Sequence, residues 1–220
     1  MRISKYGITL IRLTEDDLEL VRVKRNSAEV SNYMHYREHI TPEMQTAWFK
    51  SIDNANNFYY IIEYKSKKIG LVNDKNIDWE HKISEGGLFI WDERYVNSIV
   101  PLLVSYLVIE IAFYILGWDK SFIKVLKSNR RAVDFNISLG FSMVDDSDDL
   151  EYILLMLTRQ QFEEKARKLK KVISHLPANQ RILLSFDKQD DTNGTRRAVE
   201  KILTYAQPSV LAEKVEVVYE

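Results

Sequence analysis

A carboxylate beside two glycines is the first feature of the sequence that could take part in a reaction. Glu85 directly precedes Gly86 and Gly87 within residues 83–91, whose apolar and aromatic side chains predict a β-strand. Paired glycines in a strand indicate a bulge or the close approach of a ligand, although they can also merely bend a strand over the core. A partly buried glutamate has a raised pKa and can accept a proton. Glu85 is therefore a candidate general base, and the alternative is a structural glutamate that holds a neighbouring loop.

Other candidate sites have weaker support. His35 and His81 are alternative bases, but lone histidines in polar loops are more typical of solvated surface. Residues 189–194, followed by Glu200, echo the spacing of a calcium loop, yet the first ligand position is a glutamine and Arg196 stands where an apolar residue is usual. A polar turn that caps the next helix explains this segment better. We predict no metal site, and the sequence contains no P-loop, dinucleotide or HExxH motif.

Hydrophobic periodicity predicts an α/β (α+β) chain in which these residues lie on strands and adjoining loops. Strands are predicted at residues 8–13, 58–64, 69–72, 83–91 and 122–126, around residue 143, and at 153–157. Helices are predicted after the caps Thr14 and Thr41, at residues 98–118 and at 130–138. After residue 158 the pattern predicts a charged helix and then a small β-α-β extension at residues 182–186, 195–205 and 215–219. We therefore divide the chain into a core, residues 1–158, and an extension, residues 159–220, which packs as a separate unit or completes a homodimer.

Residues 98–118 have the length of a membrane span and carry one charge, Glu110. A carboxylate near the centre of a span costs roughly 2.5–3.5 kcal/mol on insertion scales. Amphipathic strand and helix patterns also lie on both sides of this segment. We therefore predict no membrane association, and a helix that is apolar all round because sheet and helices cover it.

Composition excludes several classes of partner. The 220 residues include 31 basic and 32 acidic side chains, interspersed along the chain, and the net charge is -1. This balance offers no basic surface for non-specific binding, so nucleic acid is not an expected partner. The chain has no cysteine, which excludes disulfides, thiolate metal sites and a cysteine nucleophile. The first residues lack the apolar run and cleavage site of a secretory signal, and we expect a cytoplasmic protein.

Four short patterns occur in a fixed order over residues 6–158. They are Arg25-Asn26 after the first helix, Ile40-Thr41 with Trp48-Phe49, Ser84 to Ile90, and Asn129 with Ala132 and Leu139-Gly140-Phe141. None is specific alone, but their joint order and spacing resemble the GNAT superfamily, within it the branch of ribosomal-protein and amino-sugar N-acetyltransferases. The resemblance implies a GNAT-like mixed, mostly antiparallel central sheet flanked by helices. It does not extend beyond residue 158.

The resemblance also implies roles for individual residues. Such proteins transfer an acyl group from acetyl-CoA to an amine, so acetyl-CoA is the expected cofactor and a small-molecule amine the expected substrate. Leu88, Phe89 and Ile90 correspond to the strand whose backbone binds the pantetheine arm, and Glu85 would accept the amine proton. The likeness places further cofactor contacts at Asn97, Ser98, Ile99, Val100 and Asn129, and acceptor contacts at Arg25, Asn26 and Tyr33. The alternative for the acceptor residues is a helix-end salt bridge and a core tyrosine.

The sequence departs from the family pattern at the start of the central helix. There the family binds the CoA pyrophosphate on backbone N–H groups of a glycine-rich loop. Residues 93–101 contain no glycine, and the usual glycines fall near Asn97, Ile99 and Pro101. Asn97 can still adopt a left-handed conformation, whereas Ile99 adds a branched side chain. The family's catalytic tyrosine falls at Asn136, which is a poor acid, although a CoA thiolate is a fair leaving group without one.

Two functions are compatible with these observations. The first is acyl-CoA-dependent transfer of an acetyl or other short acyl group to a primary amine of a small metabolite or amino sugar. The second is a non-catalytic GNAT-fold binding or scaffold protein that has lost its CoA site. The loop at residues 94–101 is the feature that distinguishes them.

Overall fold

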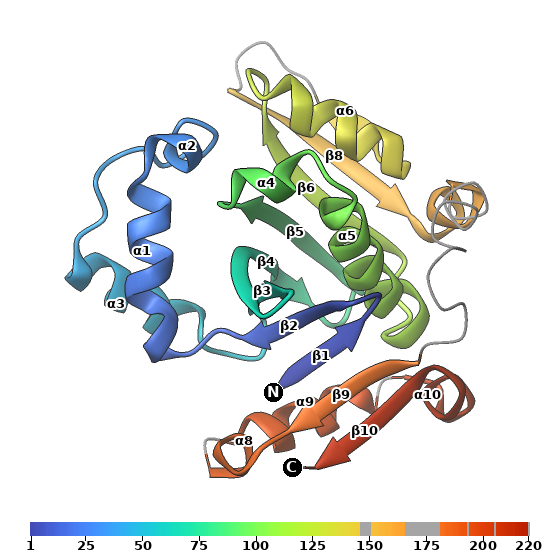
Figure 1. The fold of residues 1–220 in the computed structure, drawn as a ribbon. Helices are drawn as coiled ribbons and strands as arrows, with labels where there is room; N and C mark the ends of the chain where they lie inside the picture. The colour runs from blue at the N-terminus through green and yellow to red at the C-terminus, as the bar shows by residue number, and fades with distance from the viewer. Residues whose placement is uncertain (146–150, 166–180, 193, 205, 220) are drawn as a thin grey trace.

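The computed structural model describes residues 1–145, 151–165, 181–192, 194–204 and 206–219. In this part of the chain ten strands form one sheet, in the order β10-β9-β1-β2-β3-β4-β5-β6-β8-β7 (Figure 1). The β5–β6 and β9–β10 pairs are parallel and the other neighbours are antiparallel, so the predicted mixed, mostly antiparallel sheet is confirmed. The strands are β1 (Arg2–Lys5), β2 (Ile8–Arg12), β3 (Phe58–Tyr64), β4 (Lys67–Asp78), β5 (Ile83–Ile90), β6 (Lys120–Leu126), β7 (Ser142–Asp145), β8 (Tyr152–Thr158), β9 (Ile182–Phe186) and β10 (Val215–Tyr219).

The predicted helices are present, together with shorter ones that the sequence pattern did not indicate. Thr41 caps its helix as expected, because its Oγ1 accepts a hydrogen bond from Met44 N at 3.3 Å. Thr14 instead precedes a 3-10 turn, Glu15–Asp17, and makes no side-chain cap. Residues 159–165 begin the predicted charged helix, and the rest of it lies outside the described residues. The helices are α1 (Leu18–Asn26), α2 (Ala28–Ser31), α3 (Pro42–Ile52), α4 (Glu93–Val96), α5 (Val100–Glu110), α6 (Arg130–Leu139), α8 (Lys188–Thr192), α9 (Thr195–Leu203) and α10 (Pro208–Lys214).

Helices cover the two faces of the sheet and create two apolar cores. On one face α1 and α3 pack over residues such as Ile61 and Leu71. On the other face α5 packs over their neighbours, Ile62 and Val72. Figure 1 shows α1 and α3 on one side of strands β2 to β5 and α5 on the other. Because side chains alternate along a strand, each residue of β3, β4 and β5 belongs to one of these two faces.

The long apolar segment of the sequence is a buried helix of the core. α5 continues as a π-helical turn, Ile111–Ile115, and the chain leaves it at Gly117, whose φ of 68° favours glycine. Its one charge, Glu110, lies 2.8 Å from the Lys5 ammonium and accepts a hydrogen bond from Tyr6 at 3.0 Å. No helix in the described residues is long and apolar enough to cross a membrane.

The C-terminal extension joins the sheet of the core. β9 pairs antiparallel with β1, a strand that the sequence pattern did not indicate, and β10 lies parallel to β9 at the edge. The expected β-α-β unit is present, but the expectation that it packs as a separate unit is wrong, since its strands continue the sheet. The N-terminal ammonium of Met1 also lies 2.5 Å from Asp190 of α8. The domain boundary after residue 158 stays a prediction.

Candidate functional site

β5 and β6 pair with each other over only half of β5. Their parallel ladder ends at Gly86 and Ile123, although β5 continues to Ile90. In the described part of the chain, the second half of β5 therefore has a strand partner only on its β4 side. We call the gap between this half of β5 and β6 the strand opening. Backbone groups that face such a gap need other partners, and a bound ligand can supply them.

Leu88 and Ile90 are the residues whose backbone faces the strand opening. The N–H of Trp91 donates to Ile69 O on β4 at 2.9 Å. Backbone direction alternates along a strand, so Phe89 likewise faces β4, whereas the N–H and C=O groups of Leu88 and Ile90 point away from it. Of the three residues predicted to bind a pantetheine arm, two therefore offer free backbone groups.

The two glycines beside Glu85 are explained partly by their neighbours. A Cβ on Gly87 would lie 2.7 Å from Asn73 Oδ1, which is too close without movement of that side chain. A Cβ on Gly86 would meet Ile123 at an ordinary 3.5 Å. The bulge predicted at these glycines is wrong, because the β4–β5 register shifts further along, between Lys75 and Asp78. The close approach that requires glycine comes from the Asn73 side chain.

Glu85 lies between two lysines rather than in an apolar pocket. Its carboxylate is 2.9 Å from Lys75 Nζ and 3.6 Å from Lys124 Nζ, and Asn76 Nδ2 donates to it at 3.2 Å. Burial raises the pKa of Glu85, but the hydrogen bond and charge of Lys75, with Lys124 and Asn76, outweigh it, so the pKa lies below its ordinary value. The raised pKa predicted from the sequence is therefore wrong. The side chain is 14% exposed and carries a negative charge at neutral pH.

The two histidines considered as alternative bases lie on the surface. The His35 side chain is 77% exposed and lies 3.7 Å from Glu151. The His81 side chain is 68% exposed and lies 2.7 Å from Asp78 in the same loop. Both positions agree with the solvated surface that the sequence favoured for them.

The three residues predicted to line an acceptor pocket have different positions. Asn26 donates to Ile40 O and accepts from Ile40 N, each at 2.9 Å, so its amide ties the end of α1 to the segment before α3. Tyr33 is 58% exposed, and neither a core tyrosine nor a pocket wall is seen there. The Arg25 guanidinium lies 5.8 Å from the centre of the Phe89 ring on β5. Of these three, only Arg25 lies against the strands beside the strand opening.

Three buried nitrogen atoms on this face lack a hydrogen-bond partner. They are Arg25 Nε, Gln45 Nε2 and Asn73 Nδ2, which we call the donor cluster. Asn73 stands opposite Tyr59 on β3 and Gly87 on β5, and burial lowers the pKa of Arg25 against the opposing effect of Tyr59. Buried donors without partners cost free energy. Gln45 could have been noticed in the sequence, since it lies one helical turn before the core residue Phe49.

The segment before the central helix forms the short helix α4 in place of a glycine loop. Asp92 accepts from Arg94 N at 3.2 Å, and Tyr95 N donates to Asp92 O at 2.9 Å. Asn97 has φ −103° and ψ 14°, so the left-handed conformation considered from the sequence is wrong. The Arg131 guanidinium also binds Val96 O. The segment is thus held by its own hydrogen bonds.

Two of the first positions of α5 offer no backbone N–H group to a ligand. Val100 N donates to Ser98 Oγ at 3.1 Å. Pro101 has no N–H to offer. The Ile99 side chain stands 41% exposed, and its φ of −70° needs no glycine. This end of the site does not fit the CoA pyrophosphate that the resemblance implies, whereas the strand opening fits the pantetheine arm.

The two asparagines predicted on α6 act within that helix. Asn129 Oδ1 accepts from Ala132 N at 3.1 Å and so caps α6. Asn136 Nδ2 donates back to Ala132 O at 2.7 Å. Asn129 keeps its Nδ2 for a ligand, and the side chain of Asn136 contributes no acid.

The core of the chain is similar in sequence to known proteins. A model of the acetyltransferase (GNAT) domain matches residues 8–142. An uncharacterised protein of Methanocaldococcus jannaschii is 22% identical over 152 residues, which are 66% of this chain. The match takes in only 30% of that relative's length, so the chain spans less than a third of it.

Several solved structures share the fold. A domain from Methanocaldococcus jannaschii has a TM-score of 0.61 at 20% identity and covers 69% of this chain and 97% of its own. FdhC, described as a nucleotide-linked sugar GNAT, has a TM-score of 0.64 at 18% identity, with coverage of 78% and 97%. Spermidine N-acetyltransferase of Vibrio cholerae, solved with CoA and spermine, has a TM-score of 0.60 at 19% identity, with coverage of 72% and 99%. At these identities the likeness concerns the fold.

Proposed function

Because this chain belongs to the acetyltransferase (GNAT) domain family, we propose that it transfers an acetyl or other short acyl group from acyl-CoA to a primary amine. The observation that carries the proposal is the strand opening. It leaves the backbone groups of Leu88 and Ile90 free in the middle of a sheet, where unpaired groups are costly. A pantetheine arm is an extended amide chain, and it can pair with these groups as a short strand would.

Bound acyl-CoA would supply the thioester that is the acyl donor. The chain itself would hold and orient the two reactants. Leu88 and Ile90 bind along the arm. Glu85, ionised and fixed by Lys75, accepts hydrogen bonds from the incoming amine and takes up its proton directly or through water. The CoA thiolate would leave without a proton from position 136, and the proton taken up by Glu85 would pass to solvent or to the thiolate.

The acceptor that fits this site best carries a negative charge besides its amine. Arg25, Lys75 and Lys124 place three cations on this face of the sheet, and Glu85 pairs with the two lysines. A carboxylate or phosphate would be attracted by the excess of positive charge, so we propose small anionic amines or nucleotide-linked amino sugars in preference to polyamines.

A second candidate function is a GNAT-fold binding protein without catalysis. It is favoured by α4, whose hydrogen bonds occupy the segment where the family binds pyrophosphate. In that case the strand opening would bind an extended peptide, or small movements of β6 would close it. The two functions differ in whether acetyl-CoA binds at all.

Calorimetric titration with acetyl-CoA is the test. We expect measurable binding in the wild type, and loss of binding in Ile90→Pro, which removes the N–H that faces the strand opening but no bond of the β4 ladder. Ile90→Ala is the matched control, because it loses the same side chain and keeps the N–H. If the wild type gives no heat at millimolar cofactor, the acyltransferase proposal is refuted. Thiol release with a panel of amines then identifies the acceptor.

A further inference from the structure

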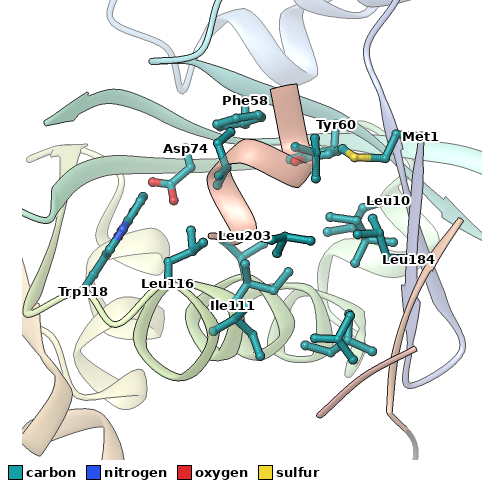
Figure 2. Close-up of a pocket in the computed structure, with 17 residues that line it drawn as sticks. Met1, Leu10, Phe58, Tyr60, Asp74, Ile111, Leu116, Trp118, Leu184 and Leu203 are labelled. Atoms are coloured by element: carbon teal, nitrogen blue, oxygen red, sulfur yellow. The ribbon is translucent and has the colours of Figure 1, made fainter. Parts of the chain in front are cut away.

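A second cavity lies on the opposite face of the sheet, between the core and the C-terminal extension. Its volume is about 100 Å³. One wall is formed by β1 to β4, another by the end of the central helix and the turn after it, and the third by β9, α9 and β10 (Figure 2). The lining includes Phe58, Tyr60, Asp74 and Trp118, together with aliphatic side chains such as Ile111 and Leu203.

Asp74 is the one carboxylate of this lining, and every other lining side chain is aliphatic or aromatic. No ion pair joins Asp74 to a cation within the described residues. The Arg12 guanidinium lies over the Phe58 ring, 4.9 Å from its centre, donates to Asn57 O at 3.1 Å and lies 3.4 Å from Asp53. The Met1 ammonium is paired with Asp190. A carboxylate in apolar surroundings without a cation is costly, and a ligand cation would relieve that cost.

Aromatic residues lie beside Asp74 in the wall of the cavity. Figure 2 shows Asp74 between the indole of Trp118 and the ring of Phe58, with Tyr60 further along the same wall. Trp118 is 2% exposed, and Phe58 and Tyr60 are stacked with ring centres 6.4 Å apart. Faces of aromatic rings attract ammonium groups. Aliphatic residues of the helix and the extension form the remaining walls and suit a hydrocarbon chain.

We propose that this cavity binds a small alkylammonium ion, with its ammonium group at Asp74 and its hydrocarbon part against the C-terminal extension. The proposal assigns a ligand site to the extension, for which neither the fold nor the family likeness implies a role. It does not depend on the acyltransferase function.

The cavity is distinct from the strand opening. Asp74 stands beside Gly86, where the β5–β6 ladder closes, and the cavity extends from there toward Leu116 and Trp118 at the end of the central helix. The strand opening extends in the other direction, toward Ile90. A cavity of 150 Å³ is known to hold benzene, so this one suits a ligand of about five non-hydrogen atoms. A polyamine would bring further charges into apolar surroundings and is not expected to fit.

Isobutylammonium and isobutanol, a pair of equal size that differs in charge, test the proposal. Binding is followed by the change in tryptophan fluorescence of the full chain, in which Trp118 is the one tryptophan of the four that lines the cavity. For a ligand of this size we expect a Kd of about 1 mM for the amine at pH 7.5, and at least about tenfold weaker binding of the alcohol. Asp74→Asn should reduce the amine's affinity to that of the alcohol. Asp134→Asn, at an exposed carboxylate on α6, should leave it unchanged.

The pH dependence of amine binding is an independent test of the same interaction. Burial raises the pKa of Asp74 to about 6, opposed by Ser84, so amine binding should weaken as the pH falls through 6. Burial raises the pKa of Tyr60, which lines the same cavity, to about 12, so its hydroxyl stays neutral between pH 5 and 8. The alcohol should show no such dependence. Equal affinities for amine and alcohol, or no amine binding at about 20 mM, would overturn the proposal.

Discussion

Replacing Asp74 by asparagine should stabilise the protein at neutral pH. Burial raises the pKa of this carboxyl from an ordinary 3.8 to about 6 in the folded chain. The folded state therefore binds the proton more tightly than the unfolded state. The free energy of unfolding then falls as the pH rises from about 4 to about 6, and the full cost of the buried charge is present above that range.

The size of the effect follows from the same shift. A difference of about two pKa units corresponds to about 3 kcal/mol of lost stability above pH 6. The asparagine amide is also polar and retains part of the burial cost, so we expect Asp74→Asn to gain about 1–2 kcal/mol at pH 7.5. In a chain of this length the gain corresponds to a rise in Tm of roughly 2–8 °C.

Urea denaturation of wild type and Asp74→Asn at pH 7.5 and pH 4 measures this difference. At pH 4 the wild-type carboxyl is protonated in the folded state, so the gain should shrink below about 1 kcal/mol. Asp134→Asn, an exposed carboxylate on α6, serves as the matched control and should change stability by less than about 0.5 kcal/mol at either pH. A loss of stability in Asp74→Asn at pH 7.5 would show that the carboxylate has a partner in the folded protein, and a gain that does not depend on pH would show that its charge is not the cause.

Three further predictions concern the face of the donor cluster. Glu85→Gln should lower kcat by about 10²–10⁴ without changing acetyl-CoA affinity. The wild-type pH–rate profile should show no ionisation of Glu85 above pH 5, because the pKa of this carboxyl lies below its ordinary value. A wild-type kcat in the variant would exclude Glu85 from the reaction. Gly87→Ala should lower the free energy of unfolding, measured by urea denaturation, by about 1 kcal/mol, because the new Cβ would meet Asn73. Adding Asn73→Ala should restore most of this stability. Additive effects of the two substitutions would contradict the contact. Arg25→Met should raise KM at least about tenfold for an anionic amine but not for its uncharged analogue; equal changes would mean that Arg25 only packs against Phe89.

Local patterns in the sequence predicted most of the sheet. The strands at residues 58–64 and 182–186 coincide with β3 and β9, because both are dense in β-branched and aromatic or aliphatic residues bounded by polar turns. β1 was missed, since its four residues, Arg2–Lys5, alternate without a strong apolar signal. β1 is also the strand that joins the extension to the core, so the pairing of β9 could not be inferred.

The candidate site depended more on contacts between distant residues. Glu85 was recognised from its place beside the glycines, but its two lysines come from β4 and β6, and no local pattern brings them to it. Their charges reverse the direction of the predicted pKa shift. The donor cluster likewise combines α1, α3 and β4. Asn26 was placed in the site by family likeness alone, whereas its hydrogen bonds to Ile40 give it a structural role.

The missing glycines should weaken the proposed cofactor binding, and hydrogen-bond energetics gives the size of the expected loss. A pyrophosphate at this place would have to replace internal bonds such as Val100 N to Ser98 Oγ. Each N–H bond withheld from a ligand costs about 0.5–1.5 kcal/mol, and bonds to a charged group cost more. Two or three such losses weaken binding by roughly 1–4.5 kcal/mol, which is about 5- to 2000-fold in Kd. Backbone pairing along β5 is unaffected by this change, so weakened binding in the wild type, abolished by Ile90→Pro, is what an acyltransferase with this loop requires.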